Sequence, residues 1–297
     1  MRAPSFSLIR FETDGPALWF KAVGKPNEKE TSITCTLAQL FPDYLPPILG
    51  TRPDWNGWLA EEAEGRNLHE TQEITFWKAA ATALARLQIE SIDHGPRILS
   101  AGARDLGPAV LASLVQPFIE MMTQLMEEQR KVPPAVLCRQ ELLSLGDCIH
   151  SALAALDAVG IPPTVGHFDL NPGNIIVSPT RCVFLDWVEA YVGNPLLSFE
   201  YLLEHLRGIT AMSASVEATL IESYCAQWEK VVSPAAFGEA LRFGPLLAVF
   251  AYAIGNDAWT DMQKLLEPAT AGYLRSLARR MNREANELTH RRPVCLH

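Results

Sequence analysis

The chain has 297 residues, of which 48% are hydrophobic and 20% are charged, and its formal net charge is −9. This length is enough for one large domain or two lobes, and no window reaches the roughly 18 consecutive apolar residues of a membrane-spanning helix. The acidic balance argues against nucleic acid as a partner. We therefore expect a soluble globular protein that binds neither nucleic acid nor a membrane.

The amino terminus, MRAPSFSLIRFE, lacks the basic and then apolar pattern of a secretion signal. The six cysteines have no CxxC spacing, which argues against a zinc knuckle or a redox pair. Reduced thiols fit a cytoplasmic location best.

The amino-terminal part is predicted to be a small lobe rich in β-strands, over residues 1–65. Asp14-Gly15-Pro16 is a turn signal between two β-prone runs, and residues 27–40 carry the apolar stripe of a helix. A Pro-rich break follows at residues 41–47. The expected strands cover residues 6–13, 17–23, 48–51 and 57–60.

Residues 66–297 are predicted to form a larger lobe that is mostly helical. Its apolar residues recur at three- and four-residue steps, Thr71 is a candidate helix cap, and Pro pairs at 133–134 and 162–163 separate helices. The expected helices cover residues 74–87, 106–125, 142–156, 196–206, 213–231, 237–254 and 262–287.

Residues 165–189, VGHFDLNPGNIIVSPTRCVFLDWVE, combine a predicted hairpin with several polar side chains. Two short apolar runs flank the turn signal Ser178-Pro179-Thr180. This hairpin would fold Asp186 back toward Asn174 and Asp169. One or two of the three side chains could then bind a hard cation such as Mg²⁺ together with phosphate oxygens and water, which leaves a carboxylate for another task.

These residues resemble a kinase active site, because they follow the same order at nearly the same spacing. HFDLNPGN and the later FLDW resemble the catalytic loop and metal-binding segment of the aminoglycoside phosphotransferase and choline kinase family, usually written HGDLHxGN and IDW. The match is specific, because several residues recur at fixed spacing. The alternative is an ordinary turn rich in Asn, Pro and Gly beside a buried hairpin.

The resemblance implies an α+β, protein kinase-like fold with two lobes. It also implies that Asp169 is the catalytic base, that Asn174 and Asp186 bind magnesium, and that His167 braces the loop. ATP is the implied co-substrate. The implied phosphate acceptor is a hydroxyl group of a small molecule, such as an aminoglycoside, an amino alcohol or a sugar.

The amino-terminal lobe carries further implied nucleotide contacts. LWFKAVG resembles the strand whose Lys contacts the nucleotide phosphates, although Lys21 could instead be a surface residue. Its partner on the next helix would be Glu30 or, with a poorer match, Glu28; either could instead be placed for the helix dipole. The backbone of the segment that crosses to the second lobe is implied to bind adenine, and the alternative is a charged loop. Its residues are Glu61, Glu62 and Ala63.

The sequence departs from the family pattern at three points. Phe168 stands where the family commonly has Gly, and Asn171 stands where it commonly has His. The family also begins with another strand and a phosphate-covering loop before the strand expected at residues 6–13. We expect either an abbreviated small lobe or a true start upstream of Met1.

Residues 185–261 hold ten Asp and Glu against three Lys and Arg, which suits a cationic acceptor. The alternative is that the acidic residues form a solvated surface and the aromatic residues form core. A second class of function is a nucleotide-binding pseudokinase or scaffold. A protein kinase is disfavoured, because little chain separates Asp186 from Gly193-Asn194-Pro195. The candidate acceptor residues are Glu189, Glu200, Glu204, Asp257, Asp261, Trp187, Tyr191 and Trp259.

Overall fold

The computed structural model describes residues 6–209, 214–255 and 257–288. The chain divides into two compact units: Met1–Asp105 with Pro163–Trp228, and Leu106–Pro162 with Glu229–His297. The amino-terminal sheet and the predicted catalytic hairpin therefore belong to the same unit. The predicted boundary after residue 65 separates two lobes by their expected functions and not by compactness, and it stays a prediction.

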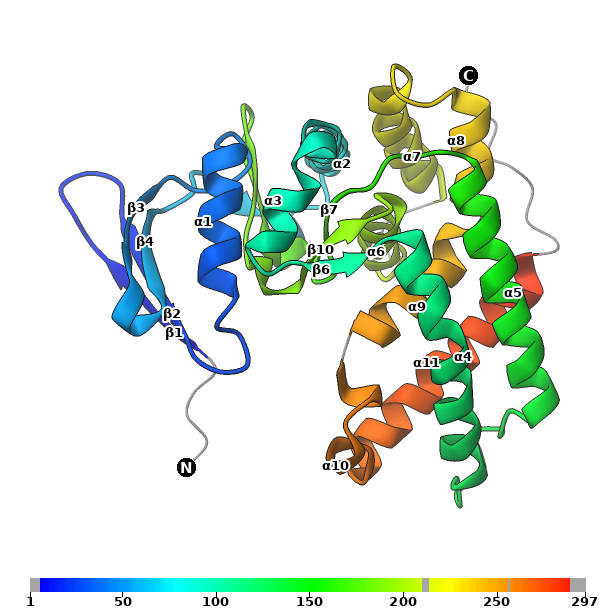
Figure 1. The fold of residues 1–297 in the computed structure, drawn as a ribbon. Helices are drawn as coiled ribbons and strands as arrows, with labels where there is room; N and C mark the ends of the chain where they lie inside the picture. Colours follow the sequence, from blue (N-terminus) through cyan, green and yellow to red (C-terminus); the bar gives the residue numbers. More distant parts are fainter. Residues whose placement is uncertain (1–5, 210–213, 256, 289–297) are drawn as a thin grey trace. The chain divides into compact units, whose positions relative to one another are not determined.

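The first unit begins with a four-stranded antiparallel sheet and one helix, shown in blue in Figure 1. The strands lie in the order β1-β2-β4-β3. Helix α1 (Glu30–Leu40) turns Ile33, Thr34 and Leu37 inward. All four predicted strands and the helix are confirmed. The strands are β1 (Phe6–Phe11), β2 (Leu18–Val23), β3 (Ile48–Arg52) and β4 (Gly57–Glu61).

Two small sheets of short strands form the rest of the β structure, in the orders β5-β8-β9 and β6-β10-β7. Only the β8–β9 hairpin was predicted. The other four strands are about as short as β8 and β9, but each pairs with a strand that is distant in the sequence, so no hairpin turn signal reveals them. The six strands are β5 (Arg66–Asn67), β6 (Arg104–Leu106), β7 (Thr164–His167), β8 (Ile175–Val177), β9 (Cys182–Phe184) and β10 (Ala190–Gly193).

Four helices complete the first unit. Helix α2 packs on α7, and the Gln88 side chain on α2 connects them: its amide oxygen accepts from Tyr224 Oη at 2.5 Å, and its amide nitrogen donates to the Pro195 carbonyl at 3.0 Å. Helix α3 was not predicted. The helices are α2 (Ile74–Glu90), α3 (Gly95–Ser100), α6 (Leu196–Arg207) and α7 (Ala214–Trp228).

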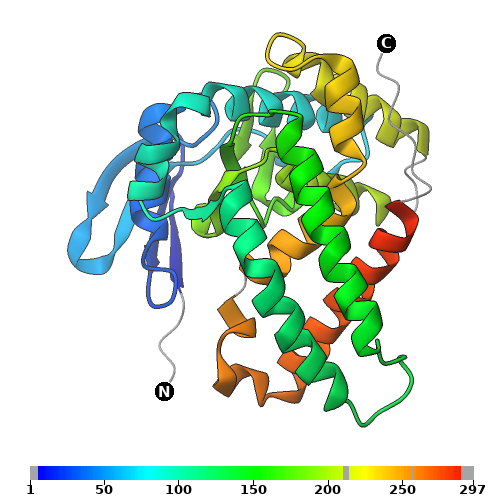
Figure 2. The same cartoon turned by 45° about the vertical axis from the view of Figure 1, so that its right-hand side comes forward.

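The second unit is helical, and the long helices α4, α5 and α11 lie beside one another in Figure 2. Phe118 packs edge-on against Phe250 and Trp259, with ring centroids 5.7 Å apart in both pairs. The helices are α4 (Pro108–Glu127), α5 (Arg139–Ala158), α8 (Pro234–Leu241), α9 (Gly244–Gly255), α10 (Met262–Leu265) and α11 (Pro268–Leu288).

Two predicted helices of this unit are wrong in extent. The helix expected over residues 237–254 consists of α8 and α9, bent by 59° at a break ahead of Gly244-Pro245. The helix expected over residues 262–287 consists of α10 and α11, and the second starts at Pro268. Proline lacks the N–H that a helix interior needs but suits a first turn, so each helix restarts at or next to a proline.

By length and composition α4 could cross a membrane, and the bent α8–α9 pair passes the same test when taken together. Core helices of soluble proteins have the same properties. Leu111, Val115, Phe118 and Met122 of α4 are buried, and α4 packs against α5 and α11. The expectation that no membrane is involved stays a prediction.

Candidate active site

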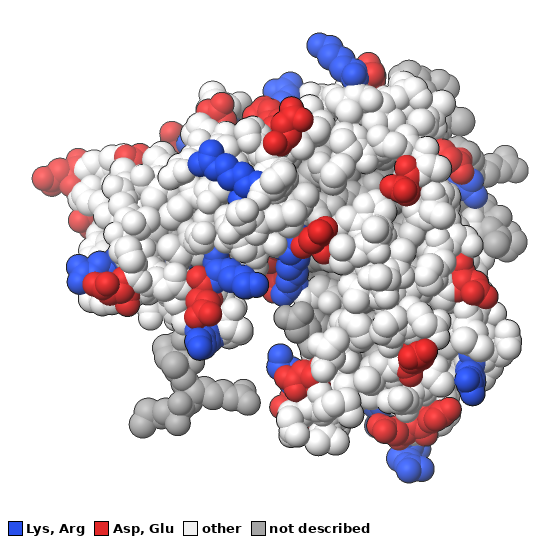
Figure 3. Space-filling model, viewed as in Figure 1, with Lys and Arg blue, Asp and Glu red and all other residues white. Residues whose placement is uncertain are grey.

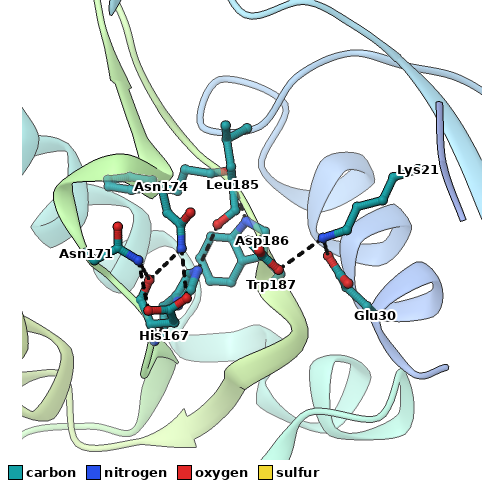
Figure 4. A network of polar contacts seen from close by, with 10 residues as sticks. Lys21, Glu30, His167, Asn171, Asn174, Leu185, Asp186 and Trp187 are labelled. Carbon is teal, nitrogen blue, oxygen red and sulfur yellow. Dashed lines mark hydrogen bonds and ion pairs between the residues drawn. The ribbon is translucent and has the colours of Figure 1, made fainter. Parts of the chain in front are cut away.

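A lysine and two carboxylates from distant parts of the chain meet in the first unit. Lys21 Nζ lies 2.5 Å from Glu30 Oε1 and 3.1 Å from Asp186 Oδ1, as Figure 4 shows. Lys21 lies on β2, Glu30 begins α1, and Asp186 follows β9. The exposed Glu28 contributes its backbone carbonyl to Asn56 instead. The structure therefore pairs Lys21 with the better-matching of the two predicted glutamates.

Glu30 is almost completely buried, with 1% of its side chain exposed. Burial raises the pKa of this carboxyl from its usual 4.5 to about 7, although the Lys21 ammonium opposes the shift. Glu30 Oε2 is buried and has no hydrogen-bond partner among the described residues. Lys21 is thus fixed on one side by a buried group, whereas Asp186, 40% exposed, is accessible to solvent.

His167 connects the two halves of the predicted site. The Asp169 N–H donates to His167 Nδ1 at 3.0 Å, so this nitrogen is unprotonated, and Nε2–H donates to the Leu185 carbonyl at 2.9 Å. Burial lowers the pKa of His167, which favours this neutral form. The ring therefore holds Asp169 and the residue before Asp186 at fixed positions, which is the geometry expected of a brace.

The Asp169 carboxylate is oriented by two asparagines. Asn174 Nδ2 donates to Asp169 Oδ2 at 3.1 Å and to its carbonyl at 2.8 Å, and Asn171 Nδ2 donates to Oδ1 at 2.8 Å. The Asn171 amide oxygen accepts the Gly173 N–H at 2.9 Å. Sequence reasoning had treated Asn171 only as a lost imidazole. The Asn-Pro-Gly order indicates its bond with the Gly173 N–H, since Asn commonly bonds the backbone two residues on, but no local pattern indicates its contact with the carboxylate.

The β8–β9 hairpin brings the second aspartate to this cluster, as predicted. Ile175 pairs with Phe184, and the Leu185 N–H donates to the Asn174 carbonyl at 2.9 Å. Asp186 then adopts a left-handed conformation, with φ of 63° and ψ of 60°. Such a backbone is strained for most L-residues, and Asp and Asn tolerate it best. The turn directs the chain from β9 into the 3₁₀ helix Trp187–Glu189.

The predicted adenine segment is already engaged in part. The Glu61 N–H donates to the Pro47 carbonyl and the Glu62 N–H donates to the Ala17 carbonyl, at 3.0 and 2.8 Å. These two amides are therefore occupied within the sheet. The N–H of Ala63 has no backbone acceptor among the described residues, and its predicted contact with adenine stays a prediction.

The Glu62 side chain is also committed. Arg10 Nε and a terminal nitrogen of Arg10 donate to its two oxygens at 2.7 and 2.9 Å, and Trp19 Nε1 donates at 2.9 Å. The hydrogen bonds from Arg10 and Trp19 lower the pKa of Glu62 to about 2. This side chain stabilises the β1–β2 edge next to the crossing segment.

Several residues proposed for a cationic acceptor have other roles. Trp187 and Tyr191 are buried, at 1% and 0% exposure, so neither offers a ring face to a ligand, and that expectation was wrong. Glu189 pairs with Arg104, and Glu200 pairs with Arg207. Trp187 and Tyr191 belong to the core instead. The Trp187 ring packs on His167, and the Tyr191 ring packs on Phe168.

Glu204 lies on α6 in the first unit, and its carboxylate acts on the neighbouring His205. The other acceptor candidates, Trp259, Asp261 and Asp257, belong to the second unit, and the side chain of Asp257 lies outside the described part of the structure. His205 on α6 was not among the predicted site residues. Its ring packs edge-on against Tyr201, with ring centroids 4.9 Å apart. Burial lowers the pKa of His205, while the carboxylates of Glu204 and Asp169 oppose the shift.

Known proteins resemble this chain in sequence pattern and in fold. The model of the phosphotransferase enzyme family matches residues 55–232. No curated protein sequence matches the chain significantly. Solved structures resemble it over nearly its whole length. Choline kinase LicA from Streptococcus pneumoniae shares 17% identity with a TM-score of 0.59, over 98% of this chain and 92% of that one.

Two further solved structures give a similar result. Macrolide 2'-phosphotransferase MphH from Brachybacterium faecium shares 15% identity with a TM-score of 0.53, over 90% of both chains. The ADP-bound aminoglycoside phosphotransferase APH(2'')-Ib shares 15% identity with a TM-score of 0.54, over 93% of this chain and 94% of that one. These likenesses show the protein kinase-like fold, with its amino-terminal β-sheet and mostly helical remainder. Because the family model spans more than half of the sequence, this protein belongs to the phosphotransferase enzyme family.

Proposed function

We propose that this protein transfers the γ-phosphate of ATP to a hydroxyl group of a small molecule. The observation that carries the proposal is the arrangement of Lys21, Glu30 and Asp186 beside the Asp169–Asn174 cluster. Lys21 and Asp186 are 165 positions apart in the chain, yet an ion pair joins them. An ordinary turn segment does not require a link to Lys21 and the buried Glu30 carboxylate.

The residues present fit a magnesium ion. Asp186 offers a partly exposed carboxylate, and the two hydrogen bonds of the Asn174 amide nitrogen leave its oxygen without a donor among the described residues. Within that part of the chain no group of three His, Cys, Asp or Glu side chains forms a metal site. Mg²⁺ commonly binds one or two protein oxygens together with phosphate oxygens and water. We therefore assign Asn174 and Asp186 as its ligands.

Each residue then has one task. Asp169 accepts the hydrogen bond of the acceptor hydroxyl, since each of its oxygens has capacity beyond the asparagine bond that it already receives. Lys21 contacts the nucleotide phosphates, held in place by Glu30. When bound, Mg²⁺ supplies positive charge to the phosphates. Most of the catalysis then comes from positioning and charge stabilisation.

We propose a small hydroxylated acceptor on the basis of family membership, and the similar structures include choline kinases and an aminoglycoside phosphotransferase. The structure lends less support to a cationic acceptor than the sequence did, because the nearby carboxylates of Glu189 and Glu200 are paired with arginines. A panel of amino alcohols, aminoglycosides, macrolides and neutral sugars decides this point. Phosphorylation of neutral acceptors alone would exclude the cationic class. The cytoplasmic location stays a proposal that rests on the sequence.

The first experiment is calorimetry of Mg²⁺-dependent ATP and GTP binding to the wild-type chain and to Asp186→Asn. Asparagine removes the charge but tolerates the left-handed backbone, so the variant avoids the strain that alanine would add. The control is Asp54→Ala, because the Asp54 side chain is 80% exposed on a surface turn. Binding that needs both Mg²⁺ and Asp186 supports the proposal. Absence of binding to the wild-type chain contradicts it.

The second experiment separates a kinase from a nucleotide-binding pseudokinase. Asp169→Asn keeps the size of the side chain but removes its ability to accept a proton. We expect this variant to bind MgATP like the wild-type chain and to lose turnover with any acceptor found in the panel. Nucleotide binding without turnover in the wild-type chain would favour the pseudokinase. Equal turnover of both proteins would show that Asp169 is not the base.

A further inference from the structure

Strand β7 leads into the catalytic loop, and serine hydroxyls bind two of its amides from neighbouring helices. Ser198 Oγ on α6 accepts the His167 N–H at 2.7 Å. Ser91 Oγ, just after α2, accepts the Val165 N–H at 2.8 Å. Alternate amides along a strand point to the same edge, and β10 occupies the other edge of β7. The two serines thus take the place of a neighbouring strand.

Ser198 is further linked to the residue after His167. Its hydroxyl shares a hydrogen bond of 2.8 Å with Tyr191 Oη, and the Tyr191 ring stacks on Phe168 with centroids 4.5 Å apart. All three side chains are buried. A Cβ at Gly166 would lie 2.0 Å from the Tyr191 ring, so only glycine lets this ring cross β7. We name Ser198, Tyr191 and Phe168 the loop clamp.

The loop clamp and the backbone between His167 and Phe168 together form a closed ring of contacts. The ring runs from the His167 amide to Ser198, on to Tyr191, then to Phe168, and returns through the chain to His167. The His167 side chain in turn fixes the Asp169 amide and the Leu185 carbonyl. A shift of the His167 backbone would therefore move both Asp169 and the segment before Asp186.

We propose that Ser198 is a positioning residue for phosphoryl transfer, acting through the loop clamp on His167. The inference rests on the proposed function. Phe168 stands where the sequence pattern of the family has glycine, and its stacking on Tyr191 explains how a large side chain is accommodated at that position. Ser91 binds the same strand by the same kind of hydrogen bond, but its hydroxyl donates to the Gln88 carbonyl and not to the loop clamp.

The test compares Ser198→Ala with Ser91→Ala. Each variant removes one buried hydroxyl and leaves one β7 amide without its acceptor, so both should destabilise the fold to a similar degree. We expect Ser198→Ala to lower kcat on the order of 10- to 100-fold, as for other residues that orient active-site groups. Its KM for ATP should stay near the wild-type value. Ser91→Ala should retain kcat.

Tyr191→Phe is the second variant, because it keeps the stacked ring and removes only the hydroxyl. We expect a smaller fall in kcat than in Ser198→Ala. The rate is followed as MgATP hydrolysis and, once the panel identifies an acceptor, as its phosphorylation. Equal losses of kcat in Ser198→Ala and Ser91→Ala would overturn the proposal, since a purely structural role predicts them. An unchanged kcat in Ser198→Ala would overturn it too.

Hydrogen exchange of the apo protein provides a readout that does not depend on turnover. We expect Ser198→Ala to speed exchange of the Asp169 amide, which His167 Nδ1 normally accepts, and Ser91→Ala to leave it unchanged. If the wild-type chain neither binds nor hydrolyses ATP, the proposed function fails while this measurement still judges the loop clamp. Protection of the Asp169 amide in Ser198→Ala equal to that in the wild-type chain would exclude the clamp.

Discussion

Asn171 orients the predicted catalytic carboxylate from a position where the family commonly has histidine. Its amide contacts both Asp169 and the Gly173 N–H. We expect Asn171→Ala to lower kcat about 10- to 100-fold, in the range found when groups that orient active-site residues are removed, with MgATP affinity retained. Steady-state kinetics and calorimetry measure the two effects. A loss of MgATP affinity with normal kcat would show that Asn171 serves the nucleotide instead.

Glu30 makes the stability of the fold depend on pH. Its pKa is about 7 in the folded chain against 4.5 as its usual value, so between these values the unfolded chain releases a proton that the folded chain keeps. Stability should therefore fall as pH rises from 4.5 to 7. Glu30→Gln should flatten this part of the profile. Urea unfolding at several pH values measures it, and Glu28→Gln is the control. A profile of Glu30→Gln parallel to that of the wild-type chain would contradict the assignment.

At the scale of elements, the β8–β9 hairpin is attached to the segment that follows α1. Arg181 donates to the carbonyls of Asp43, Pro42 and Leu45 at 2.9, 2.5 and 2.7 Å, and the Phe184 N–H donates to the Tyr44 carbonyl at 2.9 Å. One side chain thus connects the hairpin next to the proposed metal ligands to the segment that follows the helix with Glu30.

We expect Arg181→Ala to reduce the free energy of unfolding by about 1–3 kcal/mol, because three carbonyls lose a charged donor. Chemical denaturation measures the change. The control is Arg52→Ala, since the Arg52 side chain is 57% exposed and lies 3.8 Å from Asp54, a surface pair of small energetic value. Equal stability of the two variants would mean that the Arg181 bonds contribute nothing beyond a surface contact.

At the scale of the whole molecule, Lys21, Glu30 and Asp186 of the predicted nucleotide site all belong to the first unit. MgATP at about 100 times its dissociation constant should stabilise the fold by about 2.7 kcal/mol. Hydrogen exchange should locate the added protection in Met1–Asp105 and Pro163–Trp228. Asp186→Asn should abolish it. Protection confined to Leu106–Pro162 would place the nucleotide elsewhere.

The expectation that nucleic acid is not a partner stays a prediction. On the face drawn in Figure 3, basic side chains lie singly among acidic ones, and no continuous basic patch is visible there. A duplex or single strand would need such a patch to bind its phosphates. The net charge of −9 also disfavours binding to the negatively charged phosphates of a nucleic acid.

The sequence alone determined the features that local patterns encode. Turn signals and apolar periodicity located the amino-terminal strands and most long helices, and fixed spacing located Asp169, Asn174 and Asp186. Proline breaks at the starts of α9 and α11 were underestimated, because an apolar stripe continues across them. The short strands β5, β6, β7 and β10 were not predicted, since each pairs with a strand that is distant in the sequence and no hairpin turn signal joins the partners.

Only the tertiary structure decided which groups meet. It chose Glu30 over Glu28 as the partner of Lys21, used the amides of Glu61 and Glu62 within the sheet, and buried Trp187 and Tyr191 that the sequence had offered to a ligand. It also brought Ser198 and Tyr191 to His167. These outcomes depend on packing and hydrogen bonds between residues far apart in the chain, which a pattern of neighbouring residues does not contain.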